Sequence, residues 1–410
     1  MSSACNIMNR ALRKRILPQT LLVTVVLMVV YICINKDSKE SNVLRLHFGV
    51  AREVAAGSAP PPASPPSTAF SAATSAAFSA AFSTAFSPTG RPMPRCDRNT
   101  SVTNVTDFNS LPGHLKDFLY YRHCRYFPML LDTPGKCGGA DRSGDVFLLL
   151  VVKSSPGNYD RREVLRKTWA AERLHNGVWI RRVFISGTSG AGFQKERLNK
   201  LLEMEQREYS DILQWDFSDT FYNLTLKQIL FLEWMERNCP NARFLLNGDD
   251  DVLSNTDNMV TYLQSLRDNV GSKHLFTGHI IPNAKVIRFS SSKYYVPVQV
   301  QESESYPPYC GGGGFLLSGY TAMVIYRMSW DVLFHPIDDV YMGMCLAKAG
   351  LAPSFHHGVK VLGINLLTIK LPHHEACFLK ELLLVHRVLP PQMFLLWKQI
   401  HDPHLNCERE

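Results

Sequence analysis

Several sequence patterns that would assign a common function are missing from this chain. It has no Cys-x-x-Cys pair, which argues against a zinc site or a thiol redox pair. It has neither a P-loop motif nor a strand-linked Gly-x-Gly-x-x-Gly, so phosphates are not expected to bind in either of those ways. It also lacks an arginine-rich arm, and the net charge of +8 is small for 410 residues. We therefore expect no nucleic-acid partner.

An apolar stretch near the N-terminus predicts a membrane anchor. Residues 16–34 follow a basic segment, residues 1–15, and as a helix they would span about 28 Å, close to one hydrocarbon thickness. Because basic flanks stay cytosolic, residues 1–15 are predicted to be a cytosolic tail and the rest of the chain lumenal. A cleaved signal peptide is the alternative, but no small-x-small cleavage site follows the apolar run directly.

The rest of the chain is typical of the secretory pathway. A short span suits thin membranes, which predicts a single-pass type II protein of the Golgi membrane. Eight of the ten cysteines follow the anchor, where an oxidising lumen permits disulfides. Spacing does not define their pairing, and our best guess joins Cys377 to Cys407, which would tie down the C-terminal segment. Glycosylation sequons begin at Asn99, Asn104 and Asn223.

Residues 35–95 are predicted to form a disordered stem. A proline-rich run leads into a repeat of Ala, Ser, Thr and Phe, a composition that cannot support a packed core and resembles an O-glycosylated stalk. Phe78, Phe82 and Phe86 lie four residues apart, so a helix with an apolar stripe is the alternative.

Residues 96–410 have a globular composition and are predicted to form one lumenal catalytic domain. We expect strands at 146–152, 182–186, 212–215 and 244–247, and helices at 161–169, 193–209 and 224–238. Alternating strands and helices predict an α/β fold with a mostly parallel central sheet and helices on both faces. In such sheets ligands bind at the carboxyl ends of the strands.

Three consecutive carboxylates, Asp249, Asp250 and Asp251, follow the last of these strands. Adjacent like charges repel and lose hydration when buried, so they need a counter-charge. Mn²⁺ or Mg²⁺ prefers oxygen ligands and can share them with a diphosphate. The triad therefore predicts a metal-dependent enzyme that uses a nucleotide sugar, with a solvated acidic turn as the alternative.

A second acidic pair, Asp338 and Asp339, opens a helix predicted over 340–349. Sugar transfer to a hydroxyl needs a base beside the acceptor and a metal beside the leaving diphosphate. Two separated acidic groups in one domain can supply both, so we predict a catalytic role for the pair. A helix cap is the alternative.

Between the two acidic groups, residues 306–318 contain four consecutive glycines. Glycine lets a backbone approach a ligand closely, so Gly312 and Gly313 are predicted to contact the donor. Tyr306 and Tyr309 are predicted to stack on the acceptor sugar. A glycine loop without a ligand is the alternative.

Polar residues after the first buried strand are further candidates for donor binding. Lys153 and Ser154 follow that strand, and Arg162 and Arg166 share one face of the next helix. Paired arginines could clamp a pyrophosphate or a uracil carbonyl, with a solvated basic face as the alternative. His386 ends an apolar run, and we leave open whether it is a metal ligand or a core histidine.

Six motifs occur in the order seen in β-1,3-glycosyltransferases. They lie at residues 161–169, 211–227, 247–252, 293–296, 306–318 and 337–340. The resemblance covers roughly residues 110–407, and within the family the chain is most similar to the β-1,3-N-acetylglucosaminyltransferases, those of type 3 in particular. Asp338 stands where galactosyltransferases tend to have Glu, and Leu253 replaces the usual Phe after the triad.

The resemblance implies a GT-A fold, an inverting mechanism, a UDP-sugar donor and Mn²⁺ or Mg²⁺ as cofactor. It implies that Asp251 binds the metal and that Asp339 is the base, and it places Asp219 and Lys227 near the donor. The implied reaction carries N-acetylglucosamine from UDP-GlcNAc in β-1,3 linkage to a terminal galactose of poly-N-acetyllactosamine or core-1 glycans, on glycoproteins or glycolipids. The alternatives are a β-1,3-galactosyltransferase and a catalytically silent lumenal glycan-binding protein.

Overall fold

The computed structural model describes residues 96–361 and 371–407. The predicted anchor, residues 16–34, and the predicted stem, residues 35–95, lie outside the described residues, so both stay predictions. Within the described ranges, none of the helices combines the length and the apolarity that crossing a bilayer requires.

The elements alternate along the chain as the sequence predicts. The strands are β1 (Met129–Leu131), β2 (Val146–Lys153), β3 (Arg173–His175), β4 (Val178–Thr188), β5 (Ile212–Ser218), β6 (Phe244–Asp249), β7 (Val252–Ser254), β8 (Phe276–Gly278), β9 (Ile280–Ile281), β10 (Tyr309–Cys310), β11 (Gly314–Ser318), β12 (Ser354–Phe355), β13 (Val359–Lys360) and β14 (Leu384–His386). The α-helices are α3 (Gly113–Tyr121), α4 (Tyr159–Lys167), α5 (Gly192–Tyr209), α6 (Leu224–Asn238), α7 (Thr256–Ser265), α8 (Gly319–Met328), α9 (Asp338–Lys348), α10 (His373–Glu381) and α11 (Pro390–Ile400). Short 3₁₀ turns are η2 (Thr100–Asn104), η3 (Phe108–Ser110), η4 (Ser143–Asp145) and η5 (Phe221–Asn223).

The main sheet is mixed rather than mostly parallel. Its strand order is β1-β5-β4-β2-β6-β11-β8-β12, with β3 paired to β4. The central strands β5, β4, β2 and β6 are parallel, as predicted, whereas β1 and β11 pair with their neighbours in antiparallel fashion. The prediction missed β11 because this short strand begins on the last glycine of the run and carries no separate strand signal.

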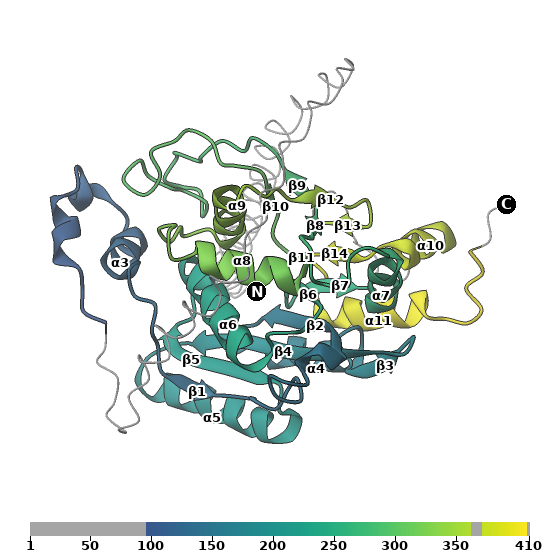
Figure 1. Cartoon of the computed structure of the whole chain (residues 1–410). Helices are drawn as coiled ribbons and strands as arrows, with labels where there is room; N and C mark the ends of the chain where they lie inside the picture. The colour runs from purple at the N-terminus through teal and green to yellow at the C-terminus, as the bar shows by residue number, and fades with distance from the viewer. Residues whose placement is uncertain (1–95, 362–370, 408–410) are drawn as a thin grey trace, which may run out of the picture. The chain divides into compact units, whose positions relative to one another are not determined.

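Helices cover both faces of this sheet (Figure 1). In β2, Leu149 and Val151 belong to a core shared with α6, α8 and α9. Leu148 and Leu150 belong to a second core, shared with α4, α7, α10 and α11. Since successive strand residues point to opposite faces, a strand buried on both sides reads as the continuous apolar run seen in the sequence.

Three disulfides connect distant parts of the described chain. They are Cys96–Cys124, Cys137–Cys239 and Cys377–Cys407, the last being the pairing guessed from the sequence. Cys137–Cys239 joins the segment after β1 to the end of α6 across 102 residues, so it removes much loop entropy from the unfolded chain. Among the described residues, the buried Cys310 and Cys345 form no disulfide.

Three segments far apart in sequence meet at the carboxyl ends of β2 and β6. The register of these two parallel strands places Lys153 opposite Asp249. The antiparallel strand β11 brings the glycine run to the same point, where the Asp249 N–H donates to the Gly313 carbonyl at 3.0 Å. In a separate small sheet, β14 pairs with β7 and sets His386 opposite Val252. The fold thus builds a site at the sheet edge where the sequence placed it.

Candidate active site

Lys153 joins the two acidic groups of the candidate active site. Its Nζ lies 3.0 Å from Asp249 Oδ1 and 2.8 Å from Asp338 Oδ2. Burial lowers the pKa of this ammonium, but the charges of Asp249, Asp338 and Asp339 outweigh that effect and raise the pKa well above its ordinary value. One buried cation therefore holds both acidic groups on the same side of the molecule.

The three carboxylates of the triad have different surroundings. Asp250 is buried and accepts hydrogen bonds from Ser154 Oγ at 2.8 Å, Asn158 Nδ2 at 2.8 Å and Arg161 Nη1 at 2.7 Å. Asp250 and Ser154 therefore bind each other in this structure, and their predicted donor contact stays a prediction. Asp249 and Asp251 stay partly exposed and can reach a ligand.

Asp249, Asp251 and His386 form a group that fits a divalent cation. One potential ligand atom of each lies within 4.8 Å of the others, and His386 Nε2 is 3.3 Å from Asp251 Oδ1. Burial raises the pKa of Asp251, but its hydrogen bond and charge interaction with His386 outweigh burial, so the pKa is lowered and the carboxylate stays ionised. Two carboxylates and an imidazole suit Mn²⁺ well and Mg²⁺ acceptably. His386 faces this group and is not enclosed in the core.

Asp339, the predicted base, lies in surroundings that change its pKa. It is half-buried, and its Oδ1 is enclosed without a hydrogen-bond partner among the described residues. Burial and the neighbouring Asp338 raise its pKa well above the ordinary carboxyl value, against the opposing charge of Lys153. Raised pKa values of this kind bring a carboxyl closer to the range useful for proton transfer.

Asp338 has a different environment from Asp339. It is buried and accepts a hydrogen bond from Lys153, which suits a residue that positions its neighbours. Ile337 is the N-cap of α9, and no side chain caps the helix there. The pair is therefore not the cap that the sequence left open as an alternative.

Gly312 and Gly313 leave room for the side chains that form the site. A Cβ at Gly312 would lie 2.7 Å from Asp339 Oδ2, and a Cβ at Gly313 would lie 2.7 Å from His386 Cγ. Gly313 also has a φ of +104°, a conformation that residues with side chains rarely adopt. These glycines are needed where Asp339 and His386 approach the backbone, and their predicted donor contact stays a prediction.

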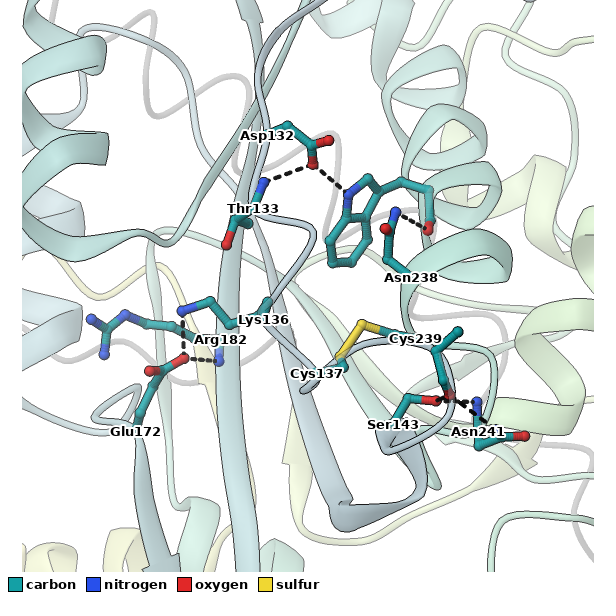
Figure 2. Close-up of a disulfide and its surroundings, with 12 residues drawn as sticks. Asp132, Thr133, Lys136, Cys137, Ser143, Glu172, Arg182, Asn238, Cys239 and Asn241 are labelled. Carbon is teal, nitrogen blue, oxygen red and sulfur yellow. Dashed lines mark hydrogen bonds and ion pairs between the residues drawn. A yellow bond between two sulfur atoms is a disulfide. The ribbon is translucent and has the colours of Figure 1, made fainter. Parts of the chain in front are cut away.

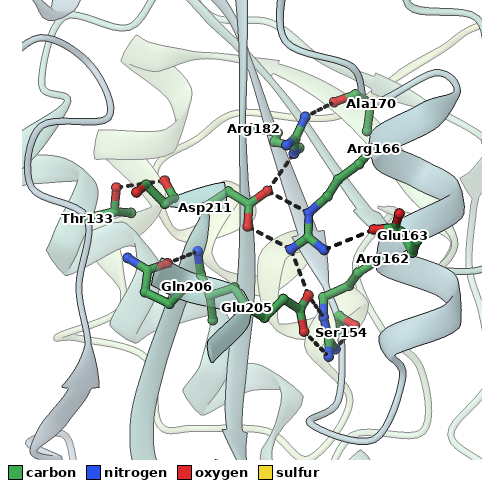
Figure 3. A network of polar contacts seen from close by, with 12 residues as sticks. Thr133, Ser154, Arg162, Glu163, Arg166, Ala170, Arg182, Glu205, Gln206 and Asp211 are labelled. Carbon is green, nitrogen blue, oxygen red and sulfur yellow. Dashed lines mark hydrogen bonds and ion pairs between the residues drawn. The ribbon is translucent and has the colours of Figure 1, made fainter. Parts of the chain in front are cut away.

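Arg162 and Arg166 are bound to buried carboxylates, and their predicted donor clamp stays a prediction (Figure 3). Arg162 Nε donates to Glu205 at 2.7 Å, and Arg166 donates to Asp211 through Nε at 2.9 Å and Nη2 at 2.8 Å. Arg182 Nε donates to the same Asp211 at 2.7 Å. All five side chains are buried. The i, i+4 spacing puts both arginines on one helix face, and that face meets Glu205 of α5 and Asp211, the residue before β5.

Arg161 and Asn158 are the site residues that the sequence analysis missed. Both bind Asp250, and Arg161 Nη1 also lies 3.8 Å from Asp251 Oδ2. Arg161 is about one-third exposed, so its guanidinium is the arginine that can reach a bound anion. Their position at the start of α4, just after β2, was the available signal, because that loop follows a carboxyl strand end.

Asp219 and Lys227 form a buried ion pair at 2.8 Å. Asp219 Oδ2 accepts the Gly187 N–H at 2.9 Å, and Lys227 Nζ lies 3.5 Å from the Ser154 carbonyl. Their charged atoms therefore bind each other and the ends of β2 and β4. In this structure the pair positions the strand ends, and its predicted place near the donor stays a prediction.

The two predicted stacking tyrosines also differ. Tyr306 is only 6% exposed, and its ring meets His335 edge-on with 5.3 Å between centroids. No sugar can stack on it in this conformation, because the segment around Val286 and Val296 covers the ring. Tyr309 is half-buried, and burial together with the charge of Asp339 raises its pKa. Tyr309 is thus the tyrosine that stays available beside Asp339.

The three sequon asparagines lie on or near the surface. Asn104 is exposed, Asn99 accepts hydrogen bonds from the N–H and hydroxyl of Ser101, and Asn223 Nδ2 donates to the Ser218 carbonyl at 2.8 Å. Their glycosylation stays a prediction.

Comparison with known proteins gives consistent matches. A galactosyltransferase family model matches residues 160–356. The chain is 50% identical over 322 residues to a human N-acetyllactosaminide beta-1,3-N-acetylglucosaminyltransferase 3, covering 78% of this chain and 84% of that protein. It is 48% identical to a human acetylgalactosaminyl-O-glycosyl-glycoprotein beta-1,3-N-acetylglucosaminyltransferase, covering 78% and 82%. A mouse UDP-GlcNAc:betaGal beta-1,3-N-acetylglucosaminyltransferase 7 is 42% identical, covering 76% and 77%.

Among solved structures, a galactosyltransferase crystallised with donor and acceptor sugar analogues aligns over 59% of this chain and 87% of its own. The TM-score is 0.32 at 13% identity.

Arg166→Met should destabilise the protein without affecting donor binding. It removes the cation shared by Asp211 and Glu205, and breaking such a buried pair typically costs about 3–5 kcal/mol. We expect that loss in the free energy of unfolding from urea titration, with an unchanged KM for the donor in the folded protein. Lys167→Met is the control, since Lys167 is exposed and should lose less than about 0.5 kcal/mol. If Arg166→Met raised the KM for the donor and left the free energy of unfolding unchanged, the result would support the predicted donor clamp.

Gly312→Ala should reduce transfer activity while the fold persists. The added methyl group would meet the Asp339 carboxylate at 2.7 Å and displace it. We expect a fall in kcat of at least about tenfold, because small displacements of a base are costly. Gly113→Ala is the control, since a Cβ there meets nothing within 4 Å. If the Gly312→Ala variant kept the kcat of the wild type, the predicted clash between residue 312 and Asp339 would be contradicted.

Proposed function

Because this chain belongs to the β-1,3-N-acetylglucosaminyltransferases of the galactosyltransferase family, we propose that it transfers N-acetylglucosamine from UDP-GlcNAc to the 3-hydroxyl of a terminal galactose. The observation that carries this proposal is the contact of Lys153 with both Asp249 and Asp338, which unites a metal-binding group and a base in one site. The names of the two human relatives favour N-acetyllactosamine and O-linked glycoprotein glycans as acceptors.

The reaction is a single displacement that inverts the anomeric carbon. The acceptor 3-oxygen forms a bond to that carbon while the bond from carbon to the UDP oxygen breaks, and UDP departs. Asp339 accepts the proton of the acceptor hydroxyl at its carboxylate. Lys153 opposes the rise in the pKa of Asp339, so more of the base stays deprotonated. No covalent nucleophile is required.

Asp249, Asp251 and His386 would hold Mn²⁺ or Mg²⁺. When bound, such a cation supplies positive charge for the diphosphate of the leaving group. Arg161 is the arginine next to this group and can contact the same diphosphate. Asp250 keeps Arg161 in place through its carboxylate.

We assign the protein to the Golgi membrane as a type II protein with a lumenal catalytic domain. The basic and apolar N-terminus, the three sequons and the disulfides support this assignment.

Asp339→Asn should abolish most transfer while donor binding is kept. The amide cannot accept the hydroxyl proton, and loss of a general base typically lowers kcat by about 10²–10⁴. The assay follows transfer from UDP-GlcNAc to a galactose-terminated acceptor by the purified full chain, and UDP binding is measured by calorimetry.

The raised pKa of Asp339 predicts a pH dependence. As the pH decreases, the wild-type kcat/KM should begin to fall at a higher pH than it would with a carboxyl of ordinary pKa.

The same assay with other donors tests the alternatives. Faster transfer from UDP-galactose would identify a β-1,3-galactosyltransferase. Glycan binding without turnover of any UDP-sugar would identify a catalytically silent lectin, and a fully active Asp339→Asn variant would reject the assigned base.

His386→Gln should raise the Mn²⁺ concentration needed for half-maximal activity by at least about tenfold, because one predicted ligand is lost. EDTA should abolish wild-type activity, and added Mn²⁺ should restore it. His404→Gln is the control, since His404 is exposed near the C-terminus. Transfer that persists in EDTA would reject the metal site.

A further inference from the structure

A cavity of about 620 Å³ lies at the opposite end of β2 from the acidic site. It is formed by the segment 132–138 after β1 and by the starts of β2 and β4, including Val146 and Trp179. Lys153 and the acidic site are at the other end of the same strand. The volume falls within the range of ordinary ligand sites, and none of the chemistry proposed above uses these residues.

Covalent and polar contacts hold the segment 132–138, which lines this cavity (Figure 2). The disulfide Cys137–Cys239 ties the segment 132–138 to the end of α6. Asp132 Oδ1 accepts from Trp234 Nε1 at 2.8 Å, and Lys136, whose side chain is 7% exposed, pairs with Glu172 at 2.9 Å. A ligand would therefore meet a rigid surface and would lose little affinity to ordering it.

The lining combines an aromatic surface with exposed polar groups. Trp179 is 38% exposed, and the Arg181 guanidinium carbon lies 4.2 Å from the centre of its ring. Arg142 and Asp145 form an exposed pair at 3.3 Å, with donors and acceptors open to solvent.

The lining cations of the cavity are paired with carboxylates. Arg142 lies 3.3 Å from Asp145, and Lys136 and Arg181 lie 2.9 and 3.7 Å from Glu172, which is outside the lining. Because each of these cations already has a counter-charge, they disfavour a polyanion such as a nucleotide or a sulfated glycan, which needs unpaired positive charge. They favour a neutral ligand with many hydroxyl groups.

We propose that this cavity is a second glycan-binding site, which takes a neutral oligosaccharide. The apolar face of a pyranose ring packs on the part of Trp179 that Arg181 leaves exposed, and Arg142 and Asp145 exchange hydrogen bonds with sugar hydroxyls. Such a site would hold a distal part of a long acceptor while its terminal galactose occupies the active site. The idea that the bound glycan is the distal part of an acceptor rests on the proposed function. Binding of the glycan itself does not, because it needs neither the donor nor Asp339.

The test measures binding of a neutral hexasaccharide of alternating galactose and N-acetylglucosamine. The probe ends in N-acetylglucosamine, so it lacks the terminal galactose that the transfer site uses. Calorimetry with the full chain, in buffer free of glycoside detergents, should show binding that weakens at least about fivefold in Trp179→Ala. Trp179→Phe keeps an aromatic ring and should bind within about twofold of wild type.

Phe193→Ala is the matched control, because Phe193 is 80% exposed and does not line the cavity. Its affinity and unfolding midpoint should equal those of the wild type. Equal affinity in wild type and Trp179→Ala, or no binding by the wild type, would overturn the proposal.

The KM for long acceptors should rise in Trp179→Ala while the KM for a disaccharide stays constant. Intact binding without any sugar transfer would reject the proposed function and keep this site.

Discussion

The buried ammonium of Lys153 is the interaction on which the active site depends. The carboxylates that surround it come from β6 and from the start of α9, which are about ninety residues apart in the chain. Without a shared cation, like charges brought this close in a half-buried site would repel and become protonated. The structure offers this cation from β2, the central strand, whose two neighbours and two packed faces leave it little freedom to move.

A second buried charge network lies on the other side of the same strand ends. Arg162 and Arg166 pair with Glu205 and Asp211, while the adjacent Arg161 turns toward the triad. Neighbouring residues on a helix point in directions about 100° apart. Arg161 therefore points toward the acidic triad, while Arg162 and Arg166 point toward the core. The same helix therefore serves both packing and the site.

The alternation of strands and helices was readable because buried central strands are long and continuously apolar. β2 and α6 follow the predicted ranges closely. β11 was not foreseen, since its short apolar run merges with the glycines before it, and its antiparallel pairing with β6 could not be inferred from periodicity. That pairing is what brings Gly312 and Gly313 against Asp339 and His386.

The sequence by itself determined the family, the α/β alternation and the residue types that the chemistry needs. Motif order and residue identity are one-dimensional properties, and they need no folding to be read. Only the tertiary structure decided which charged groups meet, because burial and side-chain direction depend on contacts between distant segments. It placed Asp250, Arg166 and Tyr306 in packed surroundings and left Asp249, Asp251, His386 and Asp339 facing the site.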